Sequence, residues 1–297
     1  DSIKRVYLKN LADTATCSAI LTPDTAFDQT HLIEVARGCP HGCRFCAAGF
    51  VYRPPRFRPI SALAKDIDQA SARTDRIGLV GAAVSDLPGL SELCGQCQDK
   101  NLRISFSSLR ADGLSPEMLA VLKNSHVKTA TIAPDAGSER MRKVINKGIT
   151  EDAILAAADA LVANGIPNLK LYFMIGLPTE TVEDLRALQD LVKALRQIKR
   201  PAGHRGKINV SVATFIPKAH TPFQWSRQLT LEESRRKIDW IHDQLKMPGI
   251  HFKWQRPEIS MLEGLWARGD RRLADLLLTA FESGCRFDGW SDHFMFD

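Results

Sequence analysis

The stretch ARGCPHGCRFCAAG, residues 36–49, places three cysteines within eight residues. Three residues separate Cys39 from Cys43, and two separate Cys43 from Cys46. The segment just before it, HLIEVARG (31–38), has the apolar composition of a buried strand. The sequence therefore predicts that the cysteines lie together on the loop at the carboxyl end of a strand.

Closely spaced thiols of this kind indicate a metal site, because thiolates bind zinc and iron–sulfur clusters. A structural zinc site usually takes four ligands in two separated pairs, and here no fourth cysteine follows closely. Three thiolates fit an iron–sulfur cluster that keeps one iron open, and an open position is typical of a catalytic centre. Two other interpretations stay open: His41 completes a zinc site, or the cysteines are close by chance.

Composition places the chain among ordinary globular proteins. Its 297 residues are 44% hydrophobic and 25% charged, with a formal net charge of +6. The positive excess is spread along the chain, so we favour a role in solubility over nucleic-acid binding. No apolar run is long enough to span a bilayer. An odd count of seven cysteines, without a recognisable secretory leader, favours a reducing compartment, and we expect a cytoplasmic protein.

Short apolar runs alternate with longer amphipathic segments along most of the chain. Strands are predicted at 31–38, 76–84, 102–109, 127–134, 168–176 and 207–217. Helices are predicted between them at 61–72, 115–124, 150–165 and 179–198. This alternation predicts βαβ units with a parallel sheet, arranged as an open or partial barrel with its site at the strand carboxyl ends.

The pattern changes after Pro222. Two helices are predicted at 231–246 and 270–284, followed by an aromatic-rich tail. We therefore predict a lead-in segment at 1–30, a core barrel at 31–225 and a helical extension at 226–297.

The cysteine stretch resembles the radical S-adenosylmethionine (SAM) superfamily. Its three cysteines, with Phe45 directly before the third, match the CxxxCxΦC signature of that family. The segments 133–148, 172–185 and 212–225 resemble the Elongator/MiaB/NifB-like branch. The chain is similar to uncharacterised radical SAM proteins often associated with an N-terminal cobalamin-binding domain. The resemblance covers 31–225 well, and it implies a partial (β/α)6 TIM-like barrel of radical SAM type.

The resemblance also implies cofactors and a reaction. Cys39, Cys43 and Cys46 would hold a [4Fe-4S] cluster whose open iron is chelated by SAM. Reductive cleavage of SAM would give a 5′-deoxyadenosyl radical for hydrogen abstraction, with an electron donor such as flavodoxin or ferredoxin. Methyl transfer that depends on cobalamin, bound by a domain outside this chain, is the favoured reaction. The alternatives are methylthiolation of RNA or protein and a non-catalytic iron–sulfur or zinc protein; the sequence names no substrate.

The same resemblance assigns SAM contacts at two predicted strand ends. Gly81, Ala82 and Ala83 stand where the family carries a GGEP segment that holds the methionine amine, although this sequence departs from that pattern. Ser107 and Arg110 follow the next strand, and an arginine there can pair bidentately with the methionine carboxylate. A tight turn and a surface salt bridge are the respective structural alternatives.

Two further positions are implied to contact SAM. Asp135 would accept a hydrogen bond from the ribose or the amine. Gly176 lies in the segment similar to IxGLPGET, whose apolar neighbours would pack against adenine.

Lys218, His220 and Trp225 are candidate substrate contacts, on a loop that resembles the branch's FxPxPxTP pattern. A packed loop that joins the barrel to the extension is the alternative for each of them. Cys94 and Cys97 form a second, isolated CxxC in a helical segment, so we expect buried thiols rather than a second cluster site.

Overall fold

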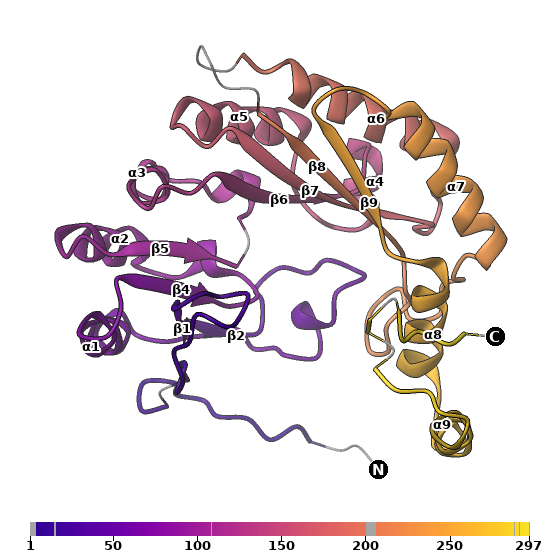
Figure 1. The fold of residues 1–297 in the computed structure, drawn as a ribbon, viewed down its shortest axis with the longest axis horizontal. Helices are drawn as coiled ribbons and strands as arrows, with labels where there is room; N and C mark the ends of the chain where they lie inside the picture. Colours follow the sequence, from indigo (N-terminus) through magenta and orange to yellow (C-terminus); the bar gives the residue numbers. More distant parts are fainter. Residues whose placement is uncertain are drawn as a thin grey trace.

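The computed structural model describes residues 4–14, 16–107, 109–199, 206–287, 289–290 and 292–296. Its main feature is a curved array of parallel strands with helices on the outer face (Figure 1). One sheet has the order β1-β4-β5, with β1 at His31–Glu34, β4 at Arg76–Val80 and β5 at Arg103–Phe106. The other has the order β6-β7-β8-β9, with β6 at Thr129–Asp135, β7 at Asn168–Ile175, β8 at Ile208–Thr214 and β9 at Ile250–Trp254.

All neighbouring strands within these two sheets run parallel. A parallel bridge between Leu109 and Ile132 connects the sheets. Within the described residues β9 has no further neighbour, and β1 pairs on its outer side only with an antiparallel stretch around Cys17. The fold is therefore the partial, open α/β barrel that the sequence predicts, and the carboxyl ends of its strands share one edge.

The helices lie where the sequence places them. The predicted ones are α1 (Ile60–Ser71), α3 (Pro116–Asn124), α5 (Glu151–Ala163), α6 (Val182–Gln197), α7 (Leu231–Gln244) and α9 (Leu273–Glu282). The helical segment expected around Cys94 and Cys97 is α2 (Leu90–Asp99), and the described residues also form α4 (Glu139–Val144) and α8 (Pro257–Arg268). Ser115 and Thr150 cap α3 and α5 by accepting hydrogen bonds from Met118 N and Ala153 N, as side chains with a free oxygen do at this position.

Strand alternation places the core between the sheets and the helices. In β7, Leu169, Leu171, Phe173 and Ile175 are buried and belong to the same apolar cluster as Leu188 and Val192 of α6. Lys170 and Tyr172 point to the opposite, concave face. The core therefore does not fill the concave face or the carboxyl ends of the strands, and an active site can form there.

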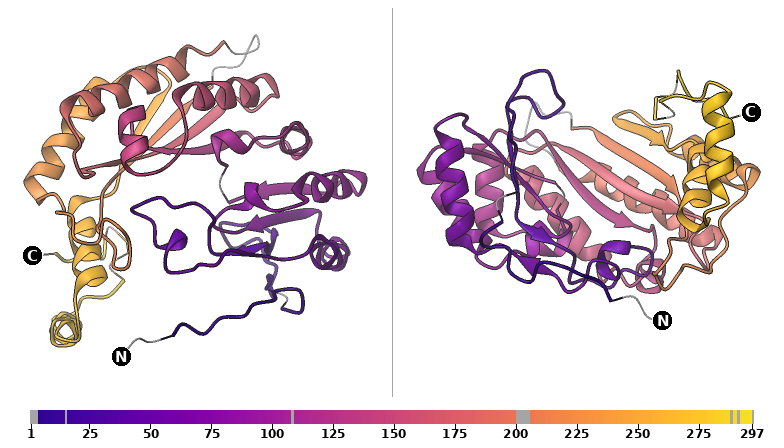
Figure 2. Two further views of the ribbon diagram at one scale, coloured as in Figure 1. Left: turned by 180° about the vertical axis from the view of Figure 1, so that it is seen from behind. Right: turned by 90° about the horizontal axis from the view of Figure 1, so that it is seen from below.

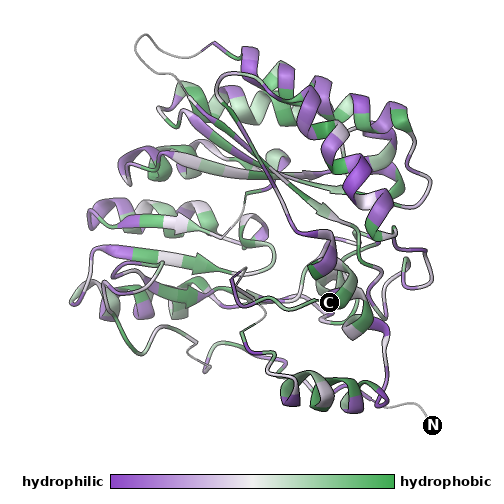
Figure 3. Ribbon diagram, turned by 45° about the vertical axis from the view of Figure 1, so that its right-hand side comes forward, coloured by the Kyte–Doolittle hydropathy of each residue, from purple (hydrophilic) through white to green (hydrophobic). Residues whose placement is uncertain are grey.

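The carboxyl-terminal part is not purely helical. The segment Ile250–Trp254 forms β9, which pairs in parallel with β8 and extends the sheet. The following helix α9 lies apart from the sheet (Figures 2 and 3), and Leu276, Leu277 and Phe281 are exposed on it. None of the described helices is both long and apolar enough to cross a membrane.

Candidate functional site

The cysteine loop leaves the barrel at the end of β1 and is closed at its base. Two short strands, β2 (Ala36–Arg37) and β3 (Arg56–Phe57), pair antiparallel. Residues 38–55 form the loop between them. Gly38 begins this loop with φ +79°, and a Cβ there would lie 2.2 Å from the Tyr52 carbonyl oxygen. Glycine is required at this turn for both reasons.

The three cysteines lie on this loop with different exposure. Cys39 and Cys43 are buried, and Cys46 is half-buried. Burial raises the pKa of Cys39, and it raises the pKa of Cys43 to about 11, although Lys147 and Arg110 oppose the shift at Cys43. Without a metal these thiols hold their protons, and metal binding would displace them.

The loop is attached to the other half of the barrel by hydrogen bonds, among them one from Arg44 Nη1 to Val144 O at 2.6 Å. Arg44 N donates to Ile145 O at 2.9 Å, and Asn146 Nδ2 donates to Gly42 O at 2.9 Å. Phe223 N donates to Arg44 O at 3.2 Å. The cysteines are therefore held between the two sheets by residues that follow α4 and β8.

Phe45 fixes the same loop through apolar packing. It contacts a second hydrophobic cluster, separate from the main core, that is centred on Met141, Leu177 and Phe215. Phe223 packs edge-on against Phe215, with ring centroids 6.0 Å apart. The hydrophobic position of the cysteine motif is thus an anchor into the opposite sheet.

Ionisable pairs surround the cysteines. Arg110 pairs bidentately with Asp112, with Nε–Oδ1 at 3.0 Å and Nη2–Oδ2 at 2.8 Å, and Nη2 also donates to Lys147 O at 3.3 Å. Lys147 Nζ lies 2.5 Å from an Asp135 carboxylate oxygen. Burial raises the pKa of Asp135, and Lys147 opposes that shift. The structure therefore brings Arg110 and Asp135 close to Cys43, each already held by a neighbour.

The segment after β4 adjoins the loop from the other side. Ser107 Oγ donates to Gly81 O at 3.1 Å, which joins two of the predicted strand-end positions. Ala83 is buried, and Gly81 packs against Val35 and Ala36. His41 Nε2 lies 2.9 Å from Asp86 Oδ2, so the loop is linked to this segment by a side-chain pair.

That pair bears on the choice of metal, because His41 is engaged by Asp86 rather than by the cysteines. In the described part of the chain, no group of three His, Cys, Asp or Glu side chains is arranged to hold one metal ion. A four-iron cluster binds each cysteine through a different iron, so its ligands stand farther apart than those of a single ion. The donor set, three soft thiols on a glycine-bent loop, fits such a cluster and does not fit a zinc site completed by His41.

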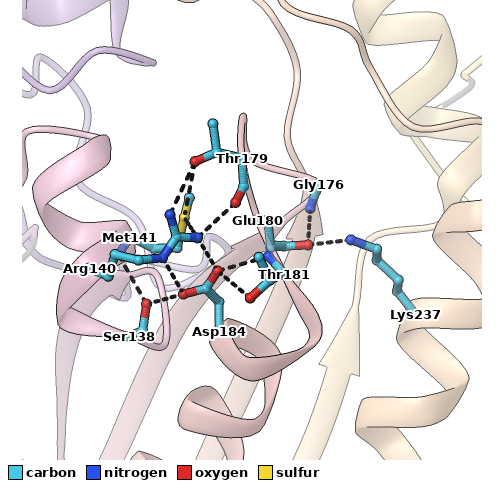
Figure 4. A network of polar contacts seen from close by, with 9 residues as sticks. All are labelled: Ser138, Arg140, Met141, Gly176, Thr179, Glu180, Thr181, Asp184 and Lys237. Atoms are coloured by element: carbon cyan, nitrogen blue, oxygen red, sulfur yellow. Dashed lines mark hydrogen bonds and ion pairs between the residues drawn. The ribbon is translucent and has the colours of Figure 1, made fainter.

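Gly176 stands at the end of β7 in a dense polar network (Figure 4). It has φ +77°, and its N–H donates to Glu180 Oε1 at 3.0 Å. Glu180 is buried and is also paired with Lys237 Nζ of α7 at 2.5 Å. The turn after β7 is therefore held by a residue of the carboxyl-terminal extension.

Asp184 organises the other half of this network. Its carboxylate accepts hydrogen bonds from Arg140, Ser138, and the backbone and hydroxyl of Thr181. Burial alone would raise the pKa of Asp184, but these donors outweigh it and lower the pKa to about 2. The network joins the loops that follow β6 and β7.

Among the described interactions, no hydrogen bond, ion pair or ring contact joins the three candidate substrate residues to one another. Lys218 Nζ is paired with Glu263 of α8 at 3.0 Å. His220 is exposed with φ +62°, and Trp225 is 82% exposed. Their assignment as substrate contacts stays a prediction.

Cys94 and Cys97 are buried in α2 and belong to the main core, as expected from the sequence. Burial raises their pKa values to about 12 and about 11.

The site features that the sequence analysis missed include Asn146, Lys147, Lys237 and the pair of His41 with Asp86. Each acts through a partner distant in the chain. The left-handed backbone of Asn146 is a feature that only coordinates reveal.

Comparison with known proteins gives consistent results. The family model described as the radical SAM superfamily matches residues 33–192. The uncharacterized protein MJ0966 of Methanocaldococcus jannaschii is 37% identical over 280 residues, which are 93% of this chain and 61% of that protein. A tRNA-2-methylthio-N(6)-dimethylallyladenosine synthase of Fusobacterium nucleatum is 27% identical over 182 residues, 56% of this chain and 41% of that enzyme.

A solved structure with the same fold is the radical SAM methyltransferase TsrM from Kitasatospora setae, with cobalamin and a [4Fe-4S] cluster bound. Its TM-score is 0.52 at 16% identity, and the match covers 65% of this chain and 38% of that one. The chain thus spans less than two thirds of each of these three proteins.

Proposed function

The chain belongs to the radical SAM superfamily, whose members bind a [4Fe-4S] cluster and SAM, and on that premise we propose that it is an enzyme that abstracts hydrogen from its substrate. The observation that carries the proposal is the cysteine loop itself. Three thiols lie on the loop at the carboxyl end of β1, and the loop is hydrogen-bonded to residues of the other half of the barrel. When bound, the reduced cluster would supply one electron to SAM, which would yield methionine and a 5′-deoxyadenosyl radical.

Cys39, Cys43 and Cys46 would hold three irons and leave the fourth for SAM. The chain's task here is to keep the loop in place and to limit water around it. Burial of Cys39 and Cys43, together with the anchoring of Phe45, does both.

Residues at three strand ends would orient SAM. Gly81 and Ala82 leave room for close backbone approach to the methionine amine. Arg110 would exchange Asp112 for the methionine carboxylate, because both ligands offer the same bidentate geometry. Asp135 would accept a hydrogen bond from the amine or the ribose, and Gly176 would line the adenine side.

Methyl transfer that depends on cobalamin, bound by a domain outside this chain, is the reaction that we favour. The neighbour with cobalamin bound supports the choice of fold, and the resemblance to proteins with a cobalamin-binding domain supports the choice of reaction. Methylthiolation is the second candidate, because a tRNA methylthiotransferase is among the relatives. An absorption spectrum of cobalamin after loading of the full-length protein would distinguish the two.

Anaerobic reconstitution with iron and sulfide tests the proposal. We expect about four irons per chain and formation of 5′-deoxyadenosine from SAM after reduction. Cys43→Ala should lose the cluster, whereas Cys97→Ala, a matched buried thiol in α2, should keep it. Full iron content in Cys43→Ala, or a wild-type protein that binds iron but leaves SAM intact, would contradict the proposal and leave a non-catalytic metal protein.

A further inference from the structure

A cavity of about 760 Å³ lies beside the cysteine loop. One wall is the amino-terminal segment Arg5–Leu8, which runs below β1 and β2 in Figure 1. The lining also includes Gly38, just before the first cysteine, and Gly81 and Ala82, where SAM is proposed to bind. A molecule in this cavity would therefore lie next to both the cluster loop and the SAM segment.

Aromatic rings and guanidinium groups lie close together in the lining of the cavity. The Arg5 Cζ atom lies 5.5 Å from the ring centroid of Tyr7 and 5.5 Å from that of Tyr52. The Arg56 Cζ atom lies 5.0 Å from the Tyr7 centroid. Tyr7 and Tyr52 keep 37% and 52% of their surfaces exposed, so ring area is free for a ligand. Planar surfaces of this kind accept another flat ring by stacking.

The charge of the cavity is positive. Glu34 is neutralised by Arg37, through a bidentate pair at 2.8 and 2.9 Å. The side chains of Arg5 and Arg56 donate instead to backbone carbonyls, among them Arg53 O at 2.8 Å and Leu8 O at 2.9 Å. Across the described ranges neither guanidinium forms an ion pair. Arg5 is exposed and can contact an anionic group directly, whereas Arg56 is buried in the cavity lining and adds positive charge beside it.

We propose that this cavity binds the substrate, and that the substrate is a flat aromatic or heteroaromatic ring that carries an anionic group, either phosphate or carboxylate. The inference rests on the proposed function, which places the reacting SAM at the Gly81 wall. The ring would stack on Tyr7 or Tyr52, and the anionic group would pair with Arg5, with the charge of Arg56 beside it.

SAM carries a sulfonium, an ammonium and a carboxylate, so its net charge is positive, and its carboxylate is already assigned to Arg110. The guanidinium groups of Arg5 and Arg56 therefore favour a molecule with net negative charge over SAM. The volume and the positive charge of the cavity therefore suit a second, anionic molecule beside SAM.

Calorimetric titration tests the inference by measuring how tightly small probe molecules bind to the reconstituted protein in the presence of SAM. The probes are uridine 5′-monophosphate, indole-3-acetate, uridine and inorganic phosphate. Uridine 5′-monophosphate represents a nucleotide and avoids the adenine of SAM, and indole-3-acetate represents an aromatic carboxylate. We expect one of these two to bind at least about tenfold more tightly than uridine and inorganic phosphate. Two results would overturn the inference. In the first, uridine and uridine 5′-monophosphate bind equally tightly and indole-3-acetate does not bind. In the second, no probe binds.

Variants locate the binding. Tyr7→Leu and Arg5→Gln should each weaken the better probe at least about fivefold. Arg186→Ala, an exposed arginine on the outer helix α6, is the matched control and should leave binding unchanged. Unchanged binding in both Tyr7→Leu and Arg5→Gln would place the ligand elsewhere and overturn the inference.

The cluster content and the formation of 5′-deoxyadenosine are measured on the same samples. If both are normal and no ring-bearing anion binds, the inference fails while the proposed function stands. If the cluster does not assemble, the proposed function fails by itself.

Discussion

The side-chain amide of Asn146 donates a hydrogen bond of 2.9 Å to the carbonyl oxygen of Gly42, and so joins the end of α4 to the middle of the cysteine loop. Asn146 has φ +55°, a conformation that asparagine tolerates better than most residues. Asn146 is therefore one of the residues that hold the cysteine loop to the other half of the barrel, without being a ligand itself.

Replacing Asn146 should loosen the cysteine loop. Asn146→Gly removes the hydrogen bond but keeps the left-handed backbone, and we expect a loss of about 1 kcal/mol in the free energy of unfolding. Asn146→Ala adds backbone strain and should cost about 1 kcal/mol more. Urea denaturation measures both values. Equal stability of wild type and Asn146→Gly would show that the bond does not hold the loop.

Gly38→Ala should be more damaging than a glycine change at another position of similar φ. The new Cβ at residue 38 would meet the Tyr52 carbonyl at 2.2 Å, whereas Gly148, with φ +70°, has no atom within 4 Å of the Cβ position. We expect about 1 kcal/mol of destabilisation in Gly148→Ala and at least about 2 kcal/mol in Gly38→Ala. Thermal unfolding compares them, and iron content after reconstitution should fall only in Gly38→Ala.

Phe45→Ala should detach the loop from the second hydrophobic cluster. Phe45 is half-buried, so we expect a loss of about 2 kcal/mol, below the range for fully buried phenylalanines. Phe45→Leu keeps most of the apolar contact and serves as the control. Hydrogen exchange of the amides at 42–46 should accelerate in the alanine variant; unchanged exchange would contradict the anchoring role.

The network around Asp184 should make stability depend on pH. Its pKa is lowered from 3.8 to about 2 in the folded protein, so the carboxylate contributes stability above its unfolded pKa. That contribution, on the order of 2 kcal/mol, is lost as the pH falls from about 4 towards 2. The difference in unfolding free energy between wild type and Asp184→Asn should therefore be largest near neutral pH and shrink on acidification.

Asp190→Asn is the control for that series, since Asp190 lies on the same helix with its side chain 75% exposed. Its unfolding free energy should follow the wild-type curve at each pH. A constant difference between wild type and Asp184→Asn across the acidic range would mean that the donors do not stabilise the charged carboxylate.

Local patterns explain which elements the sequence predicts. Each of the six predicted strands overlaps a strand of one of the two parallel sheets, and Ser115 and Thr150 cap their helices, because strand alternation and capping depend on neighbours a few residues apart. Strand β9 was missed. Its residues are mostly polar or half-exposed, and it becomes a strand by pairing with β8, which is about forty residues earlier in the chain.

The amino-acid sequence by itself determined the kind of metal centre that is expected and its place after the first strand, since the type and spacing of the three cysteines decide which metal centre a loop can hold. Only the tertiary structure decided how that loop is fixed. Phe45 enters a cluster built by other strands, Gly42 is held by Asn146, and His41 is paired with Asp86. These contacts join residues from about forty to more than one hundred positions apart, and such pairs are set by how the sheets pack, which local sequence patterns do not encode.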